Sequence, residues 1–234
     1  MTTALNPEYR RSEHGSAARP NTARLRISEI FYSLQGESRT IGFPTVFIRL
    51  SGCPLRCVYC DTPYAFGGGA WMSLPEISDG VARHRPHYVT VTGGEPLAQR
   101  PTLALLTQLC DAGYEVSLET SGALDIAGVD RRVSVVMDIK TPGSAEETRN
   151  MYANLAHLDA KDQIKFVICD RADYEWSRAR LEEFGLAGRC EVLFSPAYGT
   201  VVPADLADWI LADHLPVRMQ LQLHKLLWGN TPGR

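Results

Sequence analysis

The feature that most constrains this chain is a group of three cysteines within eight residues, Cys53, Cys57 and Cys60. Thiolates this close together can hold one metal centre, because soft sulfur ligands select zinc, copper(I) or an iron–sulfur cluster. A tetrahedral zinc site or a four-iron cluster takes four ligands, and no fourth cysteine or histidine lies near this group in the sequence. Either a remote residue completes the site, or one metal position stays open for a substrate or cofactor.

Composition narrows the class of partner. The net charge is -3 and no long basic block is present, so the chain lacks the electrostatic footprint of a nucleic-acid-binding protein. No apolar run reaches the roughly 18 residues of a membrane span, and the start of the sequence lacks the apolar stretch of a signal peptide. We therefore expect a cytoplasmic protein with a small-molecule partner, no nucleic acid and no membrane. The scattered Cys110, Cys169 and Cys190 are interpreted as buried small hydrophobic side chains.

The sequence predicts two regions. Residues 1–24 show no hydrophobic period, which predicts a disordered N-terminal tail. Residues 25–234 alternate β-rich runs with helical periods, which predicts an α/β domain with mostly parallel strands. Strands are expected at 45–50, 88–92, 115–118, 133–139, 163–168, 191–194 and 218–223, and helices at 74–83, 101–112, 174–184 and 203–212. Seven strands fall short of a closed eight-unit barrel, so we expect an incomplete, TIM-like β/α barrel.

Polar residues follow the predicted strands. The cysteines come after the first strand, and later strand ends carry Gly94 and Glu95, Ser121, Lys140, Ser195 and His224. Because the carboxyl ends of parallel strands share one edge of a sheet, these segments are expected to meet in one pocket around the cysteines.

The spacing Cys-x3-Cys-x2-Cys, with the aromatic Tyr59 before the third cysteine, resembles the radical S-adenosylmethionine (SAM) superfamily. The Gly-Gly-Glu-Pro turn at 93–96 strengthens this resemblance. It implies that Cys53, Cys57 and Cys60 hold a [4Fe-4S] cluster whose open iron binds SAM. It also implies an enzyme that cleaves SAM reductively to start radical chemistry.

Further blocks at 29–37, 42–50, 60–62 and 220–225 are similar to the 7-carboxy-7-deazaguanine synthases, and the likeness spans roughly residues 27–228. It implies a ring-contracting carbon–nitrogen lyase of queuosine and 7-deazapurine biosynthesis. The implied reaction converts 6-carboxy-5,6,7,8-tetrahydropterin to 7-carboxy-7-deazaguanine with release of ammonia, and it requires Mg2+. The family also suggests a flavodoxin or ferredoxin as electron donor and a homodimer.

The resemblance assigns site residues one by one. Thr62 would bind Mg2+ through a hard hydroxyl oxygen, and Arg49 would clamp the substrate carboxylate. The implied substrate-binding residues are Leu34, Gln35, Gly36, Glu37, Arg49, Thr92, Gln222 and His224. The implied SAM-binding residues are Tyr59, Asp61, Gly94, Glu95, Ser121, Lys140 and Ser195.

Each assignment has a structural alternative. Without the resemblance, Thr62 reads as a turn residue before a proline, Arg49 as a salt-bridged arginine, and Lys140 as the partner of Asp138. Glu95 could buttress its own turn. Three positions depart from the family pattern: Ser38, Pro54 and Gly143.

Two other functions stay open at the level of the sequence. A glycyl-radical-activating enzyme of the same superfamily would act on a protein and need no pterin site. A non-catalytic zinc-binding module would need a second Cys-x2-Cys or a His pair, which the sequence lacks. A redox dithiol at Cys57 and Cys60 would leave Cys53 unexplained.

Overall fold

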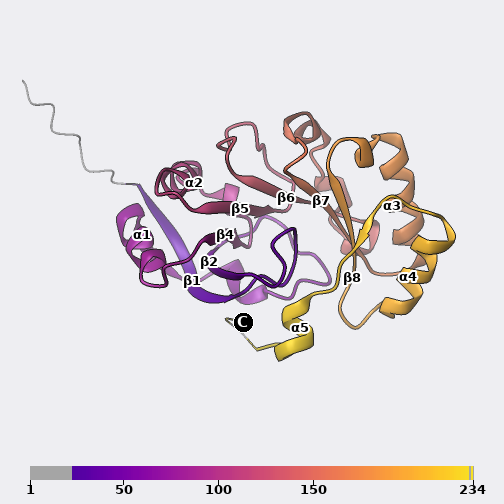
Figure 1. Ribbon diagram of the computed structural model, residues 1–234, viewed down its shortest axis with the longest axis horizontal. Helices are drawn as coiled ribbons and strands as arrows, with labels where there is room; N and C mark the ends of the chain where they lie inside the picture. Colours follow the sequence, from indigo (N-terminus) through magenta and orange to yellow (C-terminus); the bar gives the residue numbers. More distant parts are fainter. Residues whose placement is uncertain (1–22, 232, 234) are drawn as a thin grey trace, which may run out of the picture.

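A single curved sheet organises the described part of the chain, which in this computed structural model comprises residues 23–231 and 233 (Figure 1). The strand order is β3-β1-β2-β4-β5-β6-β7-β8-β9. From β2 onward all neighbouring strands are parallel. These strands are β2 (Pro44–Leu50), β4 (Tyr88–Gly93), β5 (Glu115–Thr120), β6 (Ser134–Ile139), β7 (Gln163–Ile168), β8 (Glu191–Pro196) and β9 (Arg218–Met219). Since β3 and β9 are the two edges, the sheet is not closed, which confirms the incomplete barrel.

Helices α1 to α4 lie around the outside of the sheet (Figure 1). They are α1 (Leu74–Ala82), α2 (Thr102–Asp111), α3 (Arg171–Glu183) and α4 (Pro203–Ala212). Helix α1 begins with a capping box, in which Ser73 and Glu76 satisfy each other's backbone N–H groups. Helix α3 is capped at its N-terminus by Asp170, whose carboxylate accepts from the N–H of Asp173. All four predicted helices are confirmed to within three residues.

Two strands at the start of the domain were not predicted. Strand β1 (Arg24–Leu34) runs antiparallel to both β2 and β3 (Ala70–Ser73). Its register shifts between Ile27 and Glu29, so it lacks the simple alternation that marks a strand. Residues 1–22 of the predicted tail lie outside the described part of the chain. The tail was expected to extend to residue 24, but Arg24 already belongs to β1 and pairs with Ser73. The division into a tail and one catalytic domain otherwise stays a prediction.

The last predicted strand is much shorter than expected. Only Arg218 and Met219 are strand residues beside β8. The N–H of Gln220 still donates to the carbonyl of Phe194 at 3.0 Å, and the chain then leaves the sheet. A helix that was not predicted, α5 (Leu223–Trp228), follows this turn. It carries His224 back toward the mouth of the barrel.

Buried apolar side chains form two clusters. One lies around β1, β2, β4, α1 and α2, and the other around β6, β7, β8, α3 and α4. Short 3-10 helices complete the connections: η1 (Pro63–Phe66), η2 (Pro96–Ala98), η3 (Pro142–Ser144), η4 (Glu147–Arg149), η5 (Tyr152–His157) and η6 (Leu186–Gly188). None of the helices in the described residues is both long and apolar enough to cross a membrane.

Candidate active site

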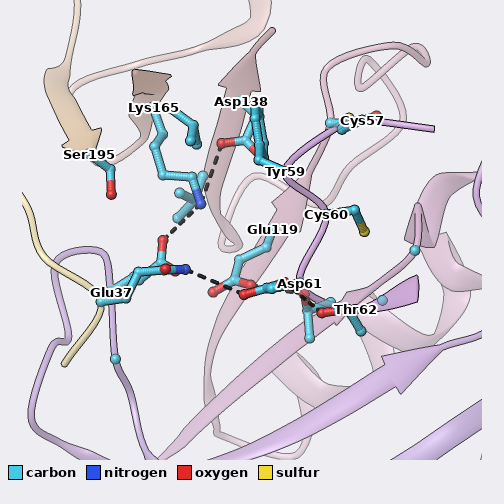
Figure 2. A pocket seen from close by; sticks show the side chains of 18 of the residues that line it. Glu37, Cys57, Tyr59, Cys60, Asp61, Thr62, Glu119, Asp138, Lys165 and Ser195 are labelled. Carbon is cyan, nitrogen blue, oxygen red and sulfur yellow. Dashed lines mark hydrogen bonds and ion pairs between the residues drawn. The ribbon is translucent and has the colours of Figure 1, made fainter. Parts of the chain in front are cut away.

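The carboxyl ends of the parallel strands surround a cavity of about 240 Å³. The predicted convergence on one pocket is confirmed, since every predicted site residue except Glu95 lines this cavity. Those that line it are Leu34, Gln35, Gly36, Glu37, Arg49, Cys53, Cys57, Tyr59, Cys60, Asp61, Thr62, Thr92, Gly94, Ser121, Lys140, Ser195, Gln222 and His224. Figure 2 shows the cysteine loop on one side of the cavity and Glu37 on the other.

Backbone hydrogen bonds fix the cysteine loop between β2 and η1. The N–H of Gly52 donates to the carbonyl of Ala65 at 2.7 Å, and the N–H of Val58 donates to that of Ser144 at 3.1 Å. The Arg56 guanidinium donates to the carbonyls of Cys53 and Leu55 at 2.8 and 2.6 Å. The loop is therefore shaped by contacts within the described protein.

The turn after β4 approaches this loop so closely that only glycine fits. A Cβ added to Gly94 would lie 2.4 Å from the Gly52 oxygen and 2.7 Å from the Cys53 Cβ. Glycine at this position lets two backbone segments pack against each other. The Gly-Gly-Glu-Pro turn and the cysteine loop thus form one unit.

The three cysteines fit an iron–sulfur cluster better than a zinc ion. Each is partly buried and free of disulfide bonds. Burial raises the pKa of the Cys53 and Cys57 thiols, and nearby Lys140 opposes that shift. Within residues 23–231 and 233, no three Cys, His, Asp or Glu side chains are grouped to share a single metal ion. An iron–sulfur cluster does not require the three sulfur atoms to meet at one metal ion, because each thiolate binds a different iron.

The structure favours the structural alternative for Glu95 over contact with SAM. Its side chain is fully buried and is not on the cavity wall. The carboxylate accepts from the N–H groups of Leu97 and Ser121 and from the hydroxyls of Thr120 and Ser121. Glu95 therefore buttresses the turn and joins the end of β4 to that of β5.

The wall below Tyr59 is a row of buried charges. Lys140 Nζ lies 2.8 Å from Asp138 Oδ2 and 5.8 Å from the centre of the Tyr59 ring. Burial tends to raise the pKa of Asp138, but the nearby Lys140 and Lys165 outweigh burial and lower it. The structural alternative for Lys140 is thus confirmed, although the residue also lines the cavity. The Tyr59 hydroxyl is buried and has no hydrogen-bond partner within the described residues.

Four residues form what we call the pocket floor: Gln35, Glu37, Thr92 and Glu119. Gln35 Nε2 donates to Glu119 Oε1 at 3.3 Å, and Thr92 Oγ1 donates to Glu119 Oε2 at 2.8 Å. The N–H of Glu37 donates to Gln35 Oε1 at 3.2 Å. Burial raises the pKa of Glu119, and Lys165 is the strongest influence that opposes this shift. The floor combines amide and carboxylate groups, so it suits a flat ring with hydrogen-bond donors and acceptors on its edge.

The C-terminal helix completes the floor. Gln222 Nε2 donates to Glu37 Oε1 at 2.9 Å, and the N–H of Leu223 donates to the Gly36 carbonyl at 3.0 Å. A Cβ on Gly36 would lie 2.2 Å from Nδ1 of His224. Burial lowers the pKa of this imidazole, which favours its neutral form. Gly36 is therefore needed for close packing against His224.

Arg49 is held between aromatic rings at the side of the cavity. Its Nε donates to Glu29 Oε1 at 2.7 Å, and its guanidinium carbon lies 5.6 Å from the Phe31 ring centre and 5.9 Å from that of Tyr64. The predicted salt bridge is present. The guanidinium still lines the cavity, where it could meet an anionic group.

The Thr62 hydroxyl donates to Asp61 Oδ1 at 2.8 Å. Burial alone would raise the pKa of Asp61, but this hydrogen bond and Lys225 Nζ, 3.6 Å from Oδ2, lower it. Because the hydroxyl hydrogen points to Asp61, the oxygen lone pairs of Thr62 can face the cavity. This arrangement suits a hard cation such as Mg2+.

The departures from the family pattern have local explanations in two cases. Ser38 has a φ of 66°, in the left-handed region where glycine is favoured. A Cβ on Gly143 would lie 2.4 Å from Asp173 Oδ2, while its N–H donates to Asp173 Oδ1 at 2.8 Å. Nothing in the structure explains Pro54.

Sequence reasoning missed one charged residue of the cavity, Lys165, and gave no role to another, Glu119, although Glu119 begins a strand-end segment that was expected at the pocket. Lys165 stands in the middle of the apolar strand Gln163–Ile168. A lone lysine inside a buried strand was the available signal, because an ionised side chain is buried only with a partner.

Comparisons with known proteins agree with this geometry. A family model described as the radical SAM superfamily matches residues 47–187. A protein of Chlorobaculum tepidum named 7-carboxy-7-deazaguanine synthase is 46% identical over 88% of this chain and 96% of its own length. A protein of the same name from Koribacter versatilis is 44% identical over 87% of this chain and 97% of its own length. A solved structure, that of QueE from Escherichia coli, shares the fold with a TM-score of 0.70 at 23% identity, covering 86% of this chain and 95% of the other.

Proposed function

Given that the chain belongs to the 7-carboxy-7-deazaguanine synthases, a family of radical SAM lyases, we propose how its cavity is divided between cofactors and substrate. As a member it uses a [4Fe-4S] cluster and SAM. The zinc-binding module and the glycyl-radical-activating enzyme are not favoured by these relationships. Bound together, the reduced cluster and SAM supply the radical chemistry.

On the cofactor side, Cys53, Cys57 and Cys60 hold the cluster. Gly94, Tyr59, Asp61, Ser121, Lys140 and Ser195 line the space that SAM fills. Support comes from the packing of Gly94 on the Cys53 Cβ and from the buried hydroxyl of Tyr59, which has no hydrogen-bond partner in the described part of the chain. Lys140 places a positive charge next to the thiolates. These residues bind and orient the cofactors, and the surrounding strands limit access of water.

On the other side, the pocket floor binds the ring of 6-carboxy-5,6,7,8-tetrahydropterin. The observation that carries this proposal is that Glu37 and Glu119 lie in the same cavity as Arg49. Buried carboxylates can accept from the amino and ring N–H groups of an aminopyrimidinone, which would otherwise lose hydrogen bonds on burial. Arg49 then meets the substrate carboxylate. Thr92, Gln222 and His224 complete the enclosure, together with Leu34.

Mg2+ is held by Thr62, with water and the substrate carboxylate as further ligands. The hydrogen bond from Thr62 to Asp61 supports this assignment because it leaves the hydroxyl oxygen free to face the cavity. A flavodoxin or ferredoxin supplies the electron, and the protein works as a homodimer, both by analogy with the family. All six cysteines are free, as is typical of a reducing compartment such as the cytoplasm.

One assay tests the substrate. Anaerobically reconstituted protein is incubated with SAM, a reductant, Mg2+ and 6-carboxy-5,6,7,8-tetrahydropterin, and the products are separated by mass. We expect 7-carboxy-7-deazaguanine and ammonia. If SAM is cleaved but no deazapurine forms, the substrate is wrong while the superfamily chemistry stands.

Cysteine variants test the cluster. Alanine at Cys53, Cys57 or Cys60 is expected to remove most of the roughly four irons per chain that a [4Fe-4S] cluster provides. Alanine at Cys110 or Cys190 is the matched control and should keep the full iron content. Equal iron loss in both groups would refute the assignment of ligands.

A further inference from the structure

Lys165 is a buried cation that the proposed chemistry does not yet use. Its Nζ lies 2.8 Å from Glu37 Oε2 and 3.4 Å from Asp138 Oδ1, and only 14% of its side chain is exposed. Figure 2 shows it reaching from β7 toward both carboxylates. Through these contacts Lys165 joins the pocket floor to the charged wall below Tyr59.

The charges that face Lys165 come from every side of the cavity. They are Glu37 after β1, Arg49 on β2, Asp61 after the cysteines, Glu119 on β5, Asp138 on β6, Lys140 just after β6, and His224 on α5. The other two cations already have close carboxylate partners, because Arg49 pairs with Glu29 and Lys140 with Asp138. Among the cations of the cavity, Lys165 is therefore the one that pairs with the floor carboxylate Glu37 and most strongly offsets the charge of Glu119.

The charge of Lys165 is fixed. Burial disfavours the ammonium, but Asp138, Glu37 and Glu119 outweigh it and raise the pKa of Lys165 well above its usual range. Such a group is a poor proton donor near neutral pH. Its effect falls on its neighbours, since it opposes the rise that burial causes in the pKa of Glu119.

We propose that Lys165 is a positioning residue that holds the Glu37 carboxylate in place by an ion pair and keeps the nearby Glu119 carboxylate ionised, so that both can accept hydrogen bonds from a ligand ring. This inference rests on the proposed function, because it assumes that the ring lies on the floor. An ionised carboxylate has only acceptors, whereas a protonated one turns one oxygen into a donor. Lys165 thereby selects rings whose facing edge carries N–H groups.

The test measures binding rather than turnover. Pterin-6-carboxylate, a stable fluorescent aminopyrimidinone, is titrated anaerobically into reconstituted protein with SAM and Mg2+ between pH 6.0 and 7.5, where its ring N–H stays protonated. For wild type we expect a Kd that changes little with pH. For Lys165→Met we expect weaker binding at pH 6.5, by about ten-fold for each unit by which the pKa of Glu119 exceeds the assay pH, and recovery as the pH rises.

Further variants separate charge from packing. Lys165→Met/Glu119→Gln has no carboxyl group left to titrate at position 119 and should lose the pH dependence. Lys161→Met is the matched control, because Lys161 also pairs with two carboxylates, Asp159 and Asp162, but lies outside the cavity. It should bind like wild type.

The outcomes distinguish the two proposals. If wild type cleaves SAM but does not bind the pterin, the proposed substrate fails. If wild type binds it and Lys165→Met binds equally well, or more weakly by the same factor at every pH, the role of Lys165 is overturned. Should Lys165→Met not fold, Lys165→Met/Glu37→Gln removes one charge of each sign, and its pH profile decides the same question.

Discussion

Replacing Glu95 with glutamine is expected to lower stability far more than SAM affinity. The Glu95 carboxylate is fully buried and receives N–H and O–H donors from Leu97, Thr120 and Ser121. It thus holds the turn that packs on the cysteine loop. Since the side chain does not line the cavity, its loss should act through the fold.

The magnitude follows from the hydrogen bonds. Glutamine keeps one acceptor oxygen and places an NH2 group where the other oxygen was, facing donors that include a backbone N–H. Hydrogen bonds to a charged group contribute about 1.5–3 kcal/mol each, and the loss of one or two lowers the free energy of unfolding by about 3 kcal/mol. For a chain of this size that lowers Tm by about 6–12 °C.

Urea and thermal unfolding of the reconstituted protein, followed by circular dichroism, measure this loss. The matched control is Glu115→Gln, since the carboxylate of Glu115 is 64% exposed and lies 3.0 Å from Nε2 of the equally exposed His87. It should change stability by less than about 0.5 kcal/mol. An unchanged stability of Glu95→Gln together with a ten-fold loss of SAM affinity would mean that Glu95 contacts SAM after all.

Three further changes test local geometry. Gly94→Ala places a Cβ 2.7 Å from that of Cys53 and should lower the iron content per chain. Gly67→Ala is the control, because no atom lies within 4 Å of the added Cβ, and it should keep the iron. Equal iron content in the two variants would refute the argument that the two backbone segments need glycine to approach. Ser38 has a φ of 66°, so Ser38→Gly should change the free energy of unfolding by no more than about 0.5 kcal/mol. Ser38→Val should lower it by more than about 1 kcal/mol. Equal losses of the two variants in urea unfolding would point to a role for the serine side chain. Burial raises the pKa of Cys169 to about 12, so at pH 8 its thiolate fraction is about 1000-fold below that of a free cysteine. Its alkylation, followed by mass spectrometry, should therefore be slow. Labelling of Cys169 at the rate of a free thiol would contradict this.

The strand ends were predictable because their physics is local. A β-rich run followed by polar residues marks the carboxyl end of a strand, and parallel pairing brings such ends to one edge. This rule places Gly94, Ser121, Lys140 and Ser195 around the cysteines, and the structure has all four on the cavity wall. The rule could not tell residues that line the cavity from residues that support it, because Glu95 follows the same strand as Gly94 and yet does not line the cavity.

The pocket floor was only partly predictable, because its members meet through long-range pairing. Gln35 and Glu37 were found through the resemblance. Glu119 and Lys165 depend on the strand order, since Lys165 reaches Glu37 across 128 positions of sequence. Neither charge has a local partner that would have marked it. Strand β1 was missed for a different reason, since a register shift hides its alternation.

The segment after β1 explains how an open sheet can still enclose a substrate. The N–H of Ser38 donates to Gln220 Oε1 at 2.7 Å, and the N–H of Arg39 donates to Gln163 Oε1 at 2.8 Å. In a closed barrel, backbone groups at this position would pair with another strand. Here glutamine side chains from β7 and from the turn after β9 satisfy them. Because these two glutamine side chains take the place of a neighbouring strand, the segment after β1 can place Gln35 and Glu37 in the cavity. The same loop therefore covers part of the open side of the sheet and carries two residues of the proposed substrate site.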